Sequence, residues 1–203
     1  MINDGYKTIA NPSKGIYKEK GSKFIAFAYP TYSESEFKKK LIQLKIDYRD
    51  ARHHCYAFRL GVDLKEYRFS DDGEPSSTAG KPIYGQIQSF ELTNISIVVI
   101  RYFGGTKLGV GGLITAYKEA AKDALNNANI ISQTVNNIYE IRFNYTIMSD
   151  VMNFIKKNKL EIKSQILEEI GVIQFSVRLS NSTSTINKFK KIDGLKIELI
   201  RTI

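Results

Sequence analysis

The sequence predicts an α+β protein made of two domains, and three observations lead to that prediction. With 203 residues, the chain is long enough to bury a core in each of two small domains. Its apolar residues alternate with period two in some segments and recur at helical spacing in others, so both strands and helices are expected. The periodicity changes near residue 134, where we place the boundary between a first domain, residues 1–133, and a second domain, residues 134–203.

The first half of the first domain is predicted to contain three strands and one helix. Residues 22–29 and 53–60 are rich in aromatic and branched side chains, which is typical of strands. Residues 64–70 are a third predicted strand, which would complete a hairpin with the second. Between the first two strands, Ser33 and Glu36 form a capping box that predicts the start of a helix.

The second half of the first domain is predicted to contain a buried strand between two helices. A short helix is predicted around residues 82–90. Its Pro82 is tolerated because it lies in the first turn. Residues 95–102 are apolar on both faces up to Arg101, as expected of a central strand. Residues 111–128 form a regular helix whose apolar stripe is small enough to lie close against a sheet. The stripe consists of Leu113, Ala116, Tyr117, Ala120, Ala124 and Ala128.

The second domain shows the order βαββαβ, which predicts a ferredoxin-like sheet with both helices on one face. If the apolar residues face the helices, the open face of the sheet carries charged residues from every strand. These are Glu140, Arg142, Lys163, Arg178, Lys196 and Glu198. An RNA-recognition motif would place aromatic residues on that face to stack bases. We therefore interpret the face as solvated, or as docked on the first domain, in preference to a weak phosphate-binding surface.

The charge of the chain favours a polyanionic partner. Its formal net charge is +9 and its pI is near 9.4, and such a field concentrates nucleic acid, ribosomes or phosphorylated ligands. The alternative is a basic protein without such a partner. Cys55 is the only cysteine, which excludes an intrachain disulfide and is typical of a reducing compartment. The sequence shows neither a signal peptide nor an apolar run that could span a bilayer, so we expect a soluble, cytoplasmic protein without a membrane partner.

The glycine-rich segment between the central strand and the long helix predicts an anion site. Glycines let a ligand approach the backbone, and the helix start adds unpaired N–H groups with a partial positive charge. The candidate anion-binding residues are Lys81, Arg101, Gly104, Gly105, Lys107, Gly109 and Gly111. The segment matches neither a Walker A loop nor the dinucleotide fingerprint, so a standard nucleotide-binding enzyme is not indicated.

Three carboxylates, Asp71, Asp72 and Glu74, precede this segment in a loop of their own. Carboxylate oxygens are ligands that Mg²⁺ prefers, so a magnesium site is one hypothesis. We favour the other, in which the carboxylates cap the next segment or form ion pairs. The cations available for such pairs are Arg68, Arg101 and Lys107.

The histidines and the cysteine do not form a catalytic pattern. His53, His54 and Cys55 are adjacent in sequence, which suits neither a productive dyad nor the spacing of zinc ligands. We assign no catalytic residue and expect one histidine to line the site while Cys55 packs in the core.

Taken together, these segments resemble the YigZ/IMPACT family over roughly residues 15–130. The matching motifs are Gly21–Phe24, Ala51–Ala57, Asp71–Pro75, Thr78–Gly80, Val99–Gly109, Gly111–Leu113 and Tyr117. The resemblance implies a ribosomal-protein-like βαβ fold for the first domain, shared with domain IV of elongation factor G. It also implies a role in translation, because eukaryotic relatives modulate translation under amino-acid starvation. The signature positions that it implies are His54, Asp71, Asp72, Glu74, Arg101, Gly104, Gly105, Lys107 and Gly109.

Three hypotheses of function follow. We favour a translation regulator that binds RNA or the ribosome through the basic, glycine-rich loop and needs no cofactor. The second is an enzyme that acts on a small phosphorylated ligand with Mg²⁺ held by the acidic residues. The third is a protein–protein interaction module in which the signature loop docks a partner.

Overall fold

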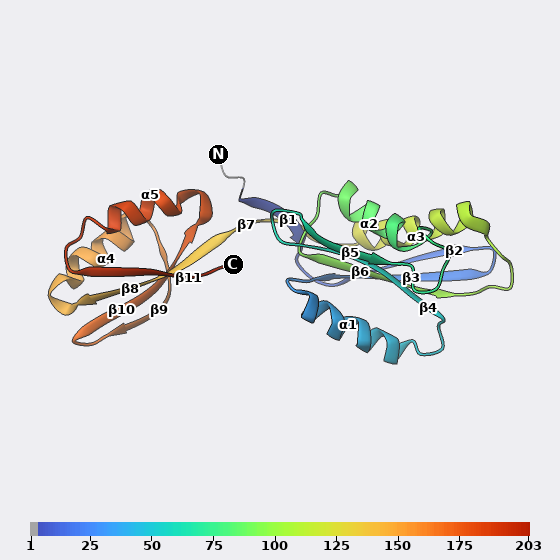
Figure 1. Cartoon of the computed structure of the whole chain (residues 1–203), viewed down its shortest axis with the longest axis horizontal. Coiled ribbons are helices and arrows are strands. Elements are labelled where there is room, and N and C mark those ends of the chain that lie inside the picture. The colour runs from blue at the N-terminus through green and yellow to red at the C-terminus, as the bar shows by residue number, and fades with distance from the viewer. Residues whose placement is uncertain (1–3) are drawn as a thin grey trace. The chain divides into compact units, whose positions relative to one another are not determined.

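The computed structural model describes residues 4–203 and confirms the predicted α+β class. Within those residues the chain has five α-helices and three sheets, of two, four and five strands (Figure 1). It divides into two compact units. The large unit is Tyr6–Gln133, and the small unit is Thr134–Ile203 together with Asp4 and Gly5. In the described residues, no helix is both long and apolar enough to cross a membrane.

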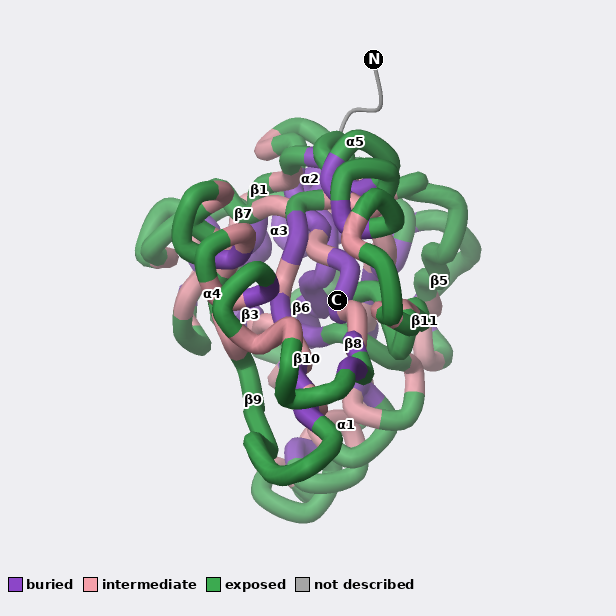
Figure 2. The backbone as a smooth tube through the Cα atoms, turned by 90° about the vertical axis from the view of Figure 1, so that its left-hand side faces the viewer, coloured by how far each residue is buried: buried purple, intermediate pink, exposed green. Residues whose placement is uncertain are grey.

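The large unit is built on a five-stranded sheet in the order β2-β3-β6-β4-β5, in which neighbouring strands are antiparallel. The central strand β6 is buried up to Arg101, as its two apolar faces predicted (Figure 2). The strands are β2 Ser13–Glu19, β3 Ser22–Pro30, β4 His53–Leu60, β5 Glu66–Ser70 and β6 Ile95–Tyr102.

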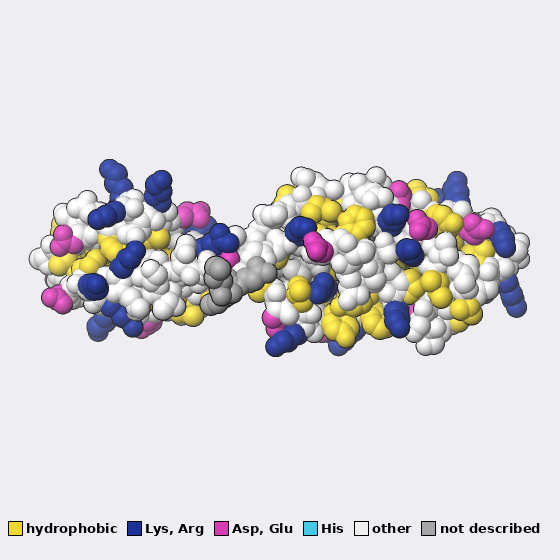
Figure 3. All heavy atoms as spheres, turned by 90° about the horizontal axis from the view of Figure 1, so that it is seen from above, with side chains coloured by type: hydrophobic (Ala, Val, Ile, Leu, Met, Phe, Trp, Pro, Cys, Tyr) yellow, Lys and Arg dark blue, Asp and Glu magenta, His cyan; other side chains and the backbone are white. Residues whose placement is uncertain are grey.

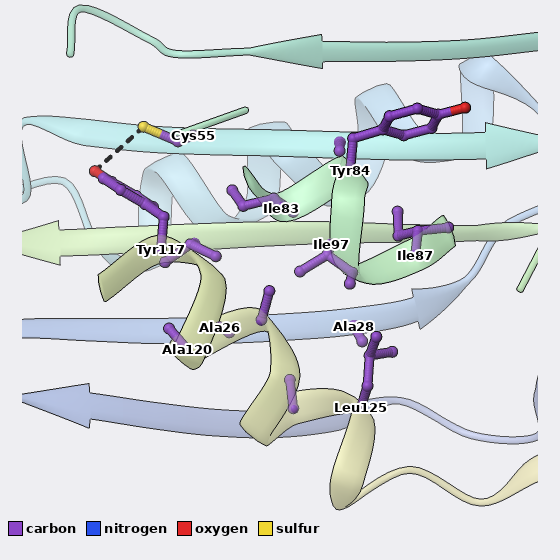
Figure 4. Close-up of a cluster of buried hydrophobic side chains, with 14 of the residues drawn as sticks. Ala26, Ala28, Cys55, Ile83, Tyr84, Ile87, Ile97, Tyr117, Ala120 and Leu125 are labelled. Carbon is purple, nitrogen blue, oxygen red and sulfur yellow. Dashed lines mark hydrogen bonds between the residues drawn. The ribbon is translucent and has the colours of Figure 1, made fainter. Parts of the chain in front are cut away.

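Helices cover both faces of this sheet (Figure 1). The helix α1, Glu34–Asp47, lies on one face, and its N-cap Ser33 accepts a hydrogen bond from the backbone N–H of Glu36, which confirms the predicted cap. The helices α2, Gly80–Ser89, and α3, Gly109–Asn126, lie on the other face. Small side chains fill much of the core beneath α3, so this helix packs close to the sheet as its alanine stripe predicted (Figure 4).

The connections in the large unit form two overlapping βαβ units. Both β3 and β4 pair antiparallel with β6, so they run parallel to each other and α1 joins them across β6. In the same way, β5 and β6 both pair antiparallel with β4, and α2 joins them. This topology brings the start of β4 and the ends of β5 and β6 to one end of the sheet.

The sequence patterns missed three strands. These are β1, Gly5–Ile9, together with β2 and β7, Ile130–Thr134. Since β1 pairs with β7, residues 131–134, just before the predicted domain boundary, belong to a strand. The three strands are short or mix polar with apolar residues, so they show no clear period. The helix α3 also begins at Gly109, earlier than the predicted residue 111.

The small unit has the predicted order βαββαβ, and its four strands form an antiparallel sheet in the order β11-β8-β10-β9. A 3₁₀ turn, η1 Tyr145–Ile147, precedes its first helix. Its outer strand β9 is largely exposed (Figure 2). The elements are β8 Asn136–Asn144, α4 Met148–Lys157, β9 Glu161–Leu167, β10 Ile170–Arg178, α5 Leu179–Phe189 and β11 Leu195–Thr202.

The open face of the small unit's sheet is less uniformly charged than expected. Lys196 lies beside Arg142 in the strand register, as the alternation predicted. On the next strand, β10, the residue paired with Arg142 is the apolar Val172. Val172 is paired in turn with the exposed Ile166 on β9. Arg178 is not a freely solvated charge, because its guanidinium forms an ion pair with the carboxylate of Asp4.

Candidate functional site

A pocket of about 910 Å³ lies in the large unit where β4 begins and β6 ends. Its walls come from four segments: residues 50–53 before and at the start of β4, residues 101–103 at the end of β6, Glu74 and Pro75, and residues 107–110 together with Leu113. We call this cavity the loop pocket. Antiparallel pairing of His53 with Arg101 places the first two segments side by side.

The glycines of the glycine-rich segment serve different purposes. Gly104 is required by packing, because a Cβ there would overlap the backbone of Gly21 and Ser22. Gly105 and Gly109 have φ of 87° and 72°, a left-handed conformation that glycine adopts without strain. A Cβ on Gly111 would meet no atom within 4 Å, so neither packing nor backbone geometry explains this glycine. Gly105, Gly109 and Gly111 all leave open space beside the backbone, as close approach by a ligand requires.

The N-terminus of α3 opens on the loop pocket. Leu108 occupies its N-cap position and, with Lys107, Gly109 and Val110, lines the cavity. Within residues 4–203, no side chain caps this helix start and no acidic residue lies in its first turn. Its first N–H groups therefore keep their partial positive charge at the pocket wall.

Arg101 is held in the pocket wall by a buried ion pair. Its Nη1 donates to Glu74 Oε1 at 2.6 Å, and the two side chains are only 9% and 4% exposed. The hydroxyl of Tyr117 donates to the same oxygen at 2.8 Å. Burial is the main cause that raises the pKa of the Tyr117 hydroxyl, so Tyr117 stays a neutral donor. Sequence reasoning named Arg101 both as an anion-binding residue and as a possible partner of the acidic loop, and in the structure its charge is paired with Glu74.

The first acidic residue, Asp71, caps α2. Its carboxylate accepts hydrogen bonds from the backbone N–H groups of Ser77 at 2.8 Å, and of Ala79 and Gly80 at 2.9 Å each. Capping was one of the two roles that the sequence favoured for this loop. The helix N-terminus beside Lys81 is consequently occupied by a protein carboxylate, and exposed Lys81 is not among the residues that line the loop pocket.

The carboxylates of the three acidic residues bind separate partners. Asp72 accepts from the backbone N–H of His54 at 2.7 Å, while Asp71 and Glu74 bind the separate partners described above. Across residues 4–203, no three His, Cys, Asp or Glu side chains come close enough together to hold a metal ion.

The two histidines are separated by strand alternation. His53 lines the loop pocket, and its Nδ1 carries a hydrogen because it lies 2.8 Å from the carbonyl oxygen of Asp72, which can only accept. His54 is buried away from the pocket lining, and burial lowers its pKa. Its Nε2 has no hydrogen-bond partner in the described residues. Cys55 packs in the core beside Tyr117, as expected (Figure 4).

The uncompensated cations of the pocket are Lys107 and Arg52. Both are exposed, and neither takes part in an ion pair found within residues 4–203. Sequence reasoning named Lys107 but missed Arg52 and the neighbouring Phe103. Their positions next to strand ends could have indicated them. Arg52 immediately precedes β4, which pairs with β6, and Phe103 immediately follows β6.

Comparison with known proteins identifies the family. Residues 20–125, more than half of the chain, match the family of the Impact N-terminal domain. The chain belongs to the IMPACT family. It is 35% identical over 148 residues to an IMPACT family member of Haemophilus influenzae, covering 72% of each protein. It is 36% identical over 138 residues to the IMPACT family member YigZ of Escherichia coli, covering 67% of this chain and 68% of that protein.

A solved structure resembles this IMPACT family chain over its whole length. The crystal structure, described as that of a hypothetical protein, aligns with a TM-score of 0.73 and 26% sequence identity, and covers 98% of this chain and 99% of the other. The match of residues 20–125 to the family and the two similar relatives confirm the resemblance seen in the sequence motifs.

Proposed function

We propose that this IMPACT family protein binds RNA on the ribosome through the loop pocket and regulates translation in the cytoplasm. The observation that carries the proposal is the pairing of two uncompensated cations, Lys107 and Arg52, with the uncapped start of α3 around one cavity. A site that combines lysine and arginine side chains with unpaired backbone N–H groups suits phosphate oxygens.

The electrostatics of the whole chain support a polyanionic partner. The net charge of +9 attracts nucleic acid at long range, but it does not locate a site. Lysine and arginine side chains are spread over the visible face of both units (Figure 3). The loop pocket differs from the rest of this basic surface because it is concave and includes the uncapped N-terminus of α3 as well as positive charge.

The architecture is compatible with the folds that the family resemblance implies. We propose that the large unit has the ribosomal-protein-like βαβ fold, which its two overlapping βαβ units support. We propose that the small unit is ferredoxin-like, which its βαββαβ order and its β11-β8-β10-β9 sheet support. The domain boundary that we infer therefore stays near residue 134.

The test is co-sedimentation of the purified protein with ribosomes across a salt series. The variant Arg52→Ala/Lys107→Ala removes the two exposed cations and leaves the Arg101–Glu74 pair intact. Its matched control, Lys39→Ala/Lys65→Ala, removes two exposed lysines that do not line the loop pocket. Because phosphate contacts release counterions, we expect the binding constant of the wild type to fall steeply with salt.

We expect the pocket variant to bind more weakly and with a smaller salt slope, while the control keeps most of its affinity. Absence of ribosome binding at low salt, or equal losses in the two variants, would overturn the proposal.

A further inference from the structure

Phe103 is a largely exposed aromatic residue that lines the loop pocket. Its side chain directly follows β6 and lies 58% exposed, although burying a phenylalanine ring stabilises a protein by about 1.5–3 kcal/mol. The ring therefore occupies a position that the folding of the large unit does not use. It lines the pocket together with Lys107 and Arg52.

The ring of Phe103 is supported from behind by a rigid stack. The guanidinium of Arg101 lies over it at 5.6 Å from the ring centroid, and the same guanidinium lies 5.5 Å from the centroid of buried Phe24. Since Glu74 holds the guanidinium by its 2.6 Å ion pair, the stack has little freedom to move. The Phe103 ring is thus an exposed apolar surface that contacts a held guanidinium and lines the same pocket as two exposed cations.

We propose that Phe103 is the stacking platform for one unpaired nucleobase, whose flanking phosphates bind Lys107 and Arg52. This inference rests on the proposed RNA-binding function and narrows its ligand to single-stranded RNA. Aromatic side chains stack on the exposed face of a base, and basic side chains alongside track the backbone. A base inside a duplex has both faces covered by its neighbours, so Phe103 selects against paired RNA.

The chain offers a direct optical test, because it contains no tryptophan. The variant Phe103→Trp keeps an aromatic platform and introduces a single tryptophan at the proposed contact, which can be excited selectively over the 12 tyrosines. Titration with an unlabelled single-stranded oligonucleotide is expected to quench its emission, while a blunt duplex of equal length quenches it far less. A Phe69→Trp variant carries its fluorophore on another partly exposed phenylalanine, outside the pocket lining, and should be unaffected.

Affinity gives the second readout, measured by fluorescence anisotropy with a labelled single strand. Phe103→Leu keeps an apolar side chain but loses the ring, and we expect it to bind roughly 10- to 100-fold more weakly, as the loss of one base–aromatic stack predicts. Its salt slope should match the wild type, because the phosphate contacts remain. Lys107→Ala should instead lower the slope by about one unit.

The outcomes separate the two proposals. Salt-dependent RNA binding that is equally tight in Phe103→Leu and the wild type would overturn the stacking role and leave the RNA-binding function standing. Equal affinity for single strands and duplexes would do the same. Failure of the wild type to bind any RNA would overturn both. Because the Phe103 ring is largely exposed, matched thermal unfolding of the variants should show that they remain folded.

Discussion

Two helices on the same face of the large unit's sheet begin in opposite ways. The start of α2 receives the carboxylate of Asp71, which accepts from three backbone N–H groups. The start of α3 receives no side chain of the described chain and opens on the loop pocket. A helix N-terminus attracts anions in either case, but a carboxylate of the protein itself satisfies one and leaves the other available to a ligand.

The remaining helices make the contrast sharper. Ser33 caps α1, Asp150 lies in the first turn of α4, and Asp4 binds the first turn of α5. Of the five helices found in residues 4–203, α3 is thus the one whose start has neither a side-chain cap nor an acidic residue. Lys107 and Gly109 lie at that helix start, and Arg52 lines the same pocket from the segment before β4.

The largest expected effect comes from Glu74, which belongs to the loop that caps α2 but anchors the wall of the pocket beside α3. In Glu74→Ala the buried guanidinium of Arg101 loses its partner, so we expect the free energy of unfolding in urea to fall by about 3–5 kcal/mol. Glu74→Gln retains an acceptor and should lose less. Unchanged stability of Glu74→Ala would show that Arg101 is not held as the structure indicates.

Removal of the α2 cap should have the next largest effect. Asp71→Ala leaves three backbone N–H groups without their acceptor, and we expect a loss of about 2 kcal/mol, at the upper end of the range for N-cap substitutions. Asp71→Asn keeps a side-chain oxygen and serves as the control. If urea unfolding showed no difference between Asp71→Ala and the wild type, α2 would be no better capped than α3 and the contrast would disappear.

The start of α5 provides a test that depends on pH. Hydrogen bonds from Arg178, followed by the backbone N–H of Ser180, hold the pKa of the Asp4 carboxyl well below its usual value. A lowered pKa contributes stability that is fully present above about pH 4, the unfolded pKa, and is lost as the pH falls toward the folded pKa. We expect Asp4→Asn to be less stable than the wild type at pH 7, with the difference shrinking below pH 4. The measurement is thermal unfolding of the full chain at pH 7 and below pH 4. If the difference in stability between Asp4→Asn and the wild type were the same at both, Asp4 would not titrate in this way.

The smallest change in stability is expected where α3 is made to resemble α2. Gly111→Asp places a carboxylate in the first turn of α3, where a Cβ has open space and φ needs no glycine. Relative to the matched Gly111→Asn, we expect the protein to gain about 0.3–1 kcal/mol of stability from the helix dipole. Ribosome co-sedimentation should weaken at the same time, because the new carboxylate competes for the site. Undiminished binding would place the ligand elsewhere.

Elements with strong local patterns could be predicted from the sequence. The strand β6 and the helix α3 are long and strongly periodic, and the capping box at Ser33 is a local signal. By contrast, β1 and β7 pair with each other although they lie at opposite ends of the large unit's chain. No local pattern shows such a pairing, because it depends on the closure of the whole unit.

The glycine-rich loop was predictable as a candidate anion site, but the roles of its charged neighbours were not. Adjacent Asp71 and Asp72 bind different partners because the chain turns sharply there, with φ of 42° at Asp72 and 88° at Gly73. The pairing of Glu74 with Arg101 joins a loop to a strand that follows α2. Which cation is neutralised and which stays available, as at Lys107, therefore depends on tertiary contacts.

The burial of Cys55 makes the chain its own reporter of transient opening. Its Sγ lies 3.0 Å from the carbonyl oxygen of Asp71 and 3.3 Å from Tyr117 Oη, and burial raises the pKa of the thiol. Because alkylating reagents react with an exposed thiolate, Cys55 is protected as long as β4 and α3 stay together. The chain has no second cysteine, so each labelling event marks one separation of the core. The rate of Cys55 modification under native conditions is divided by the rate in the unfolded chain. This ratio measures how often β4 and α3 separate.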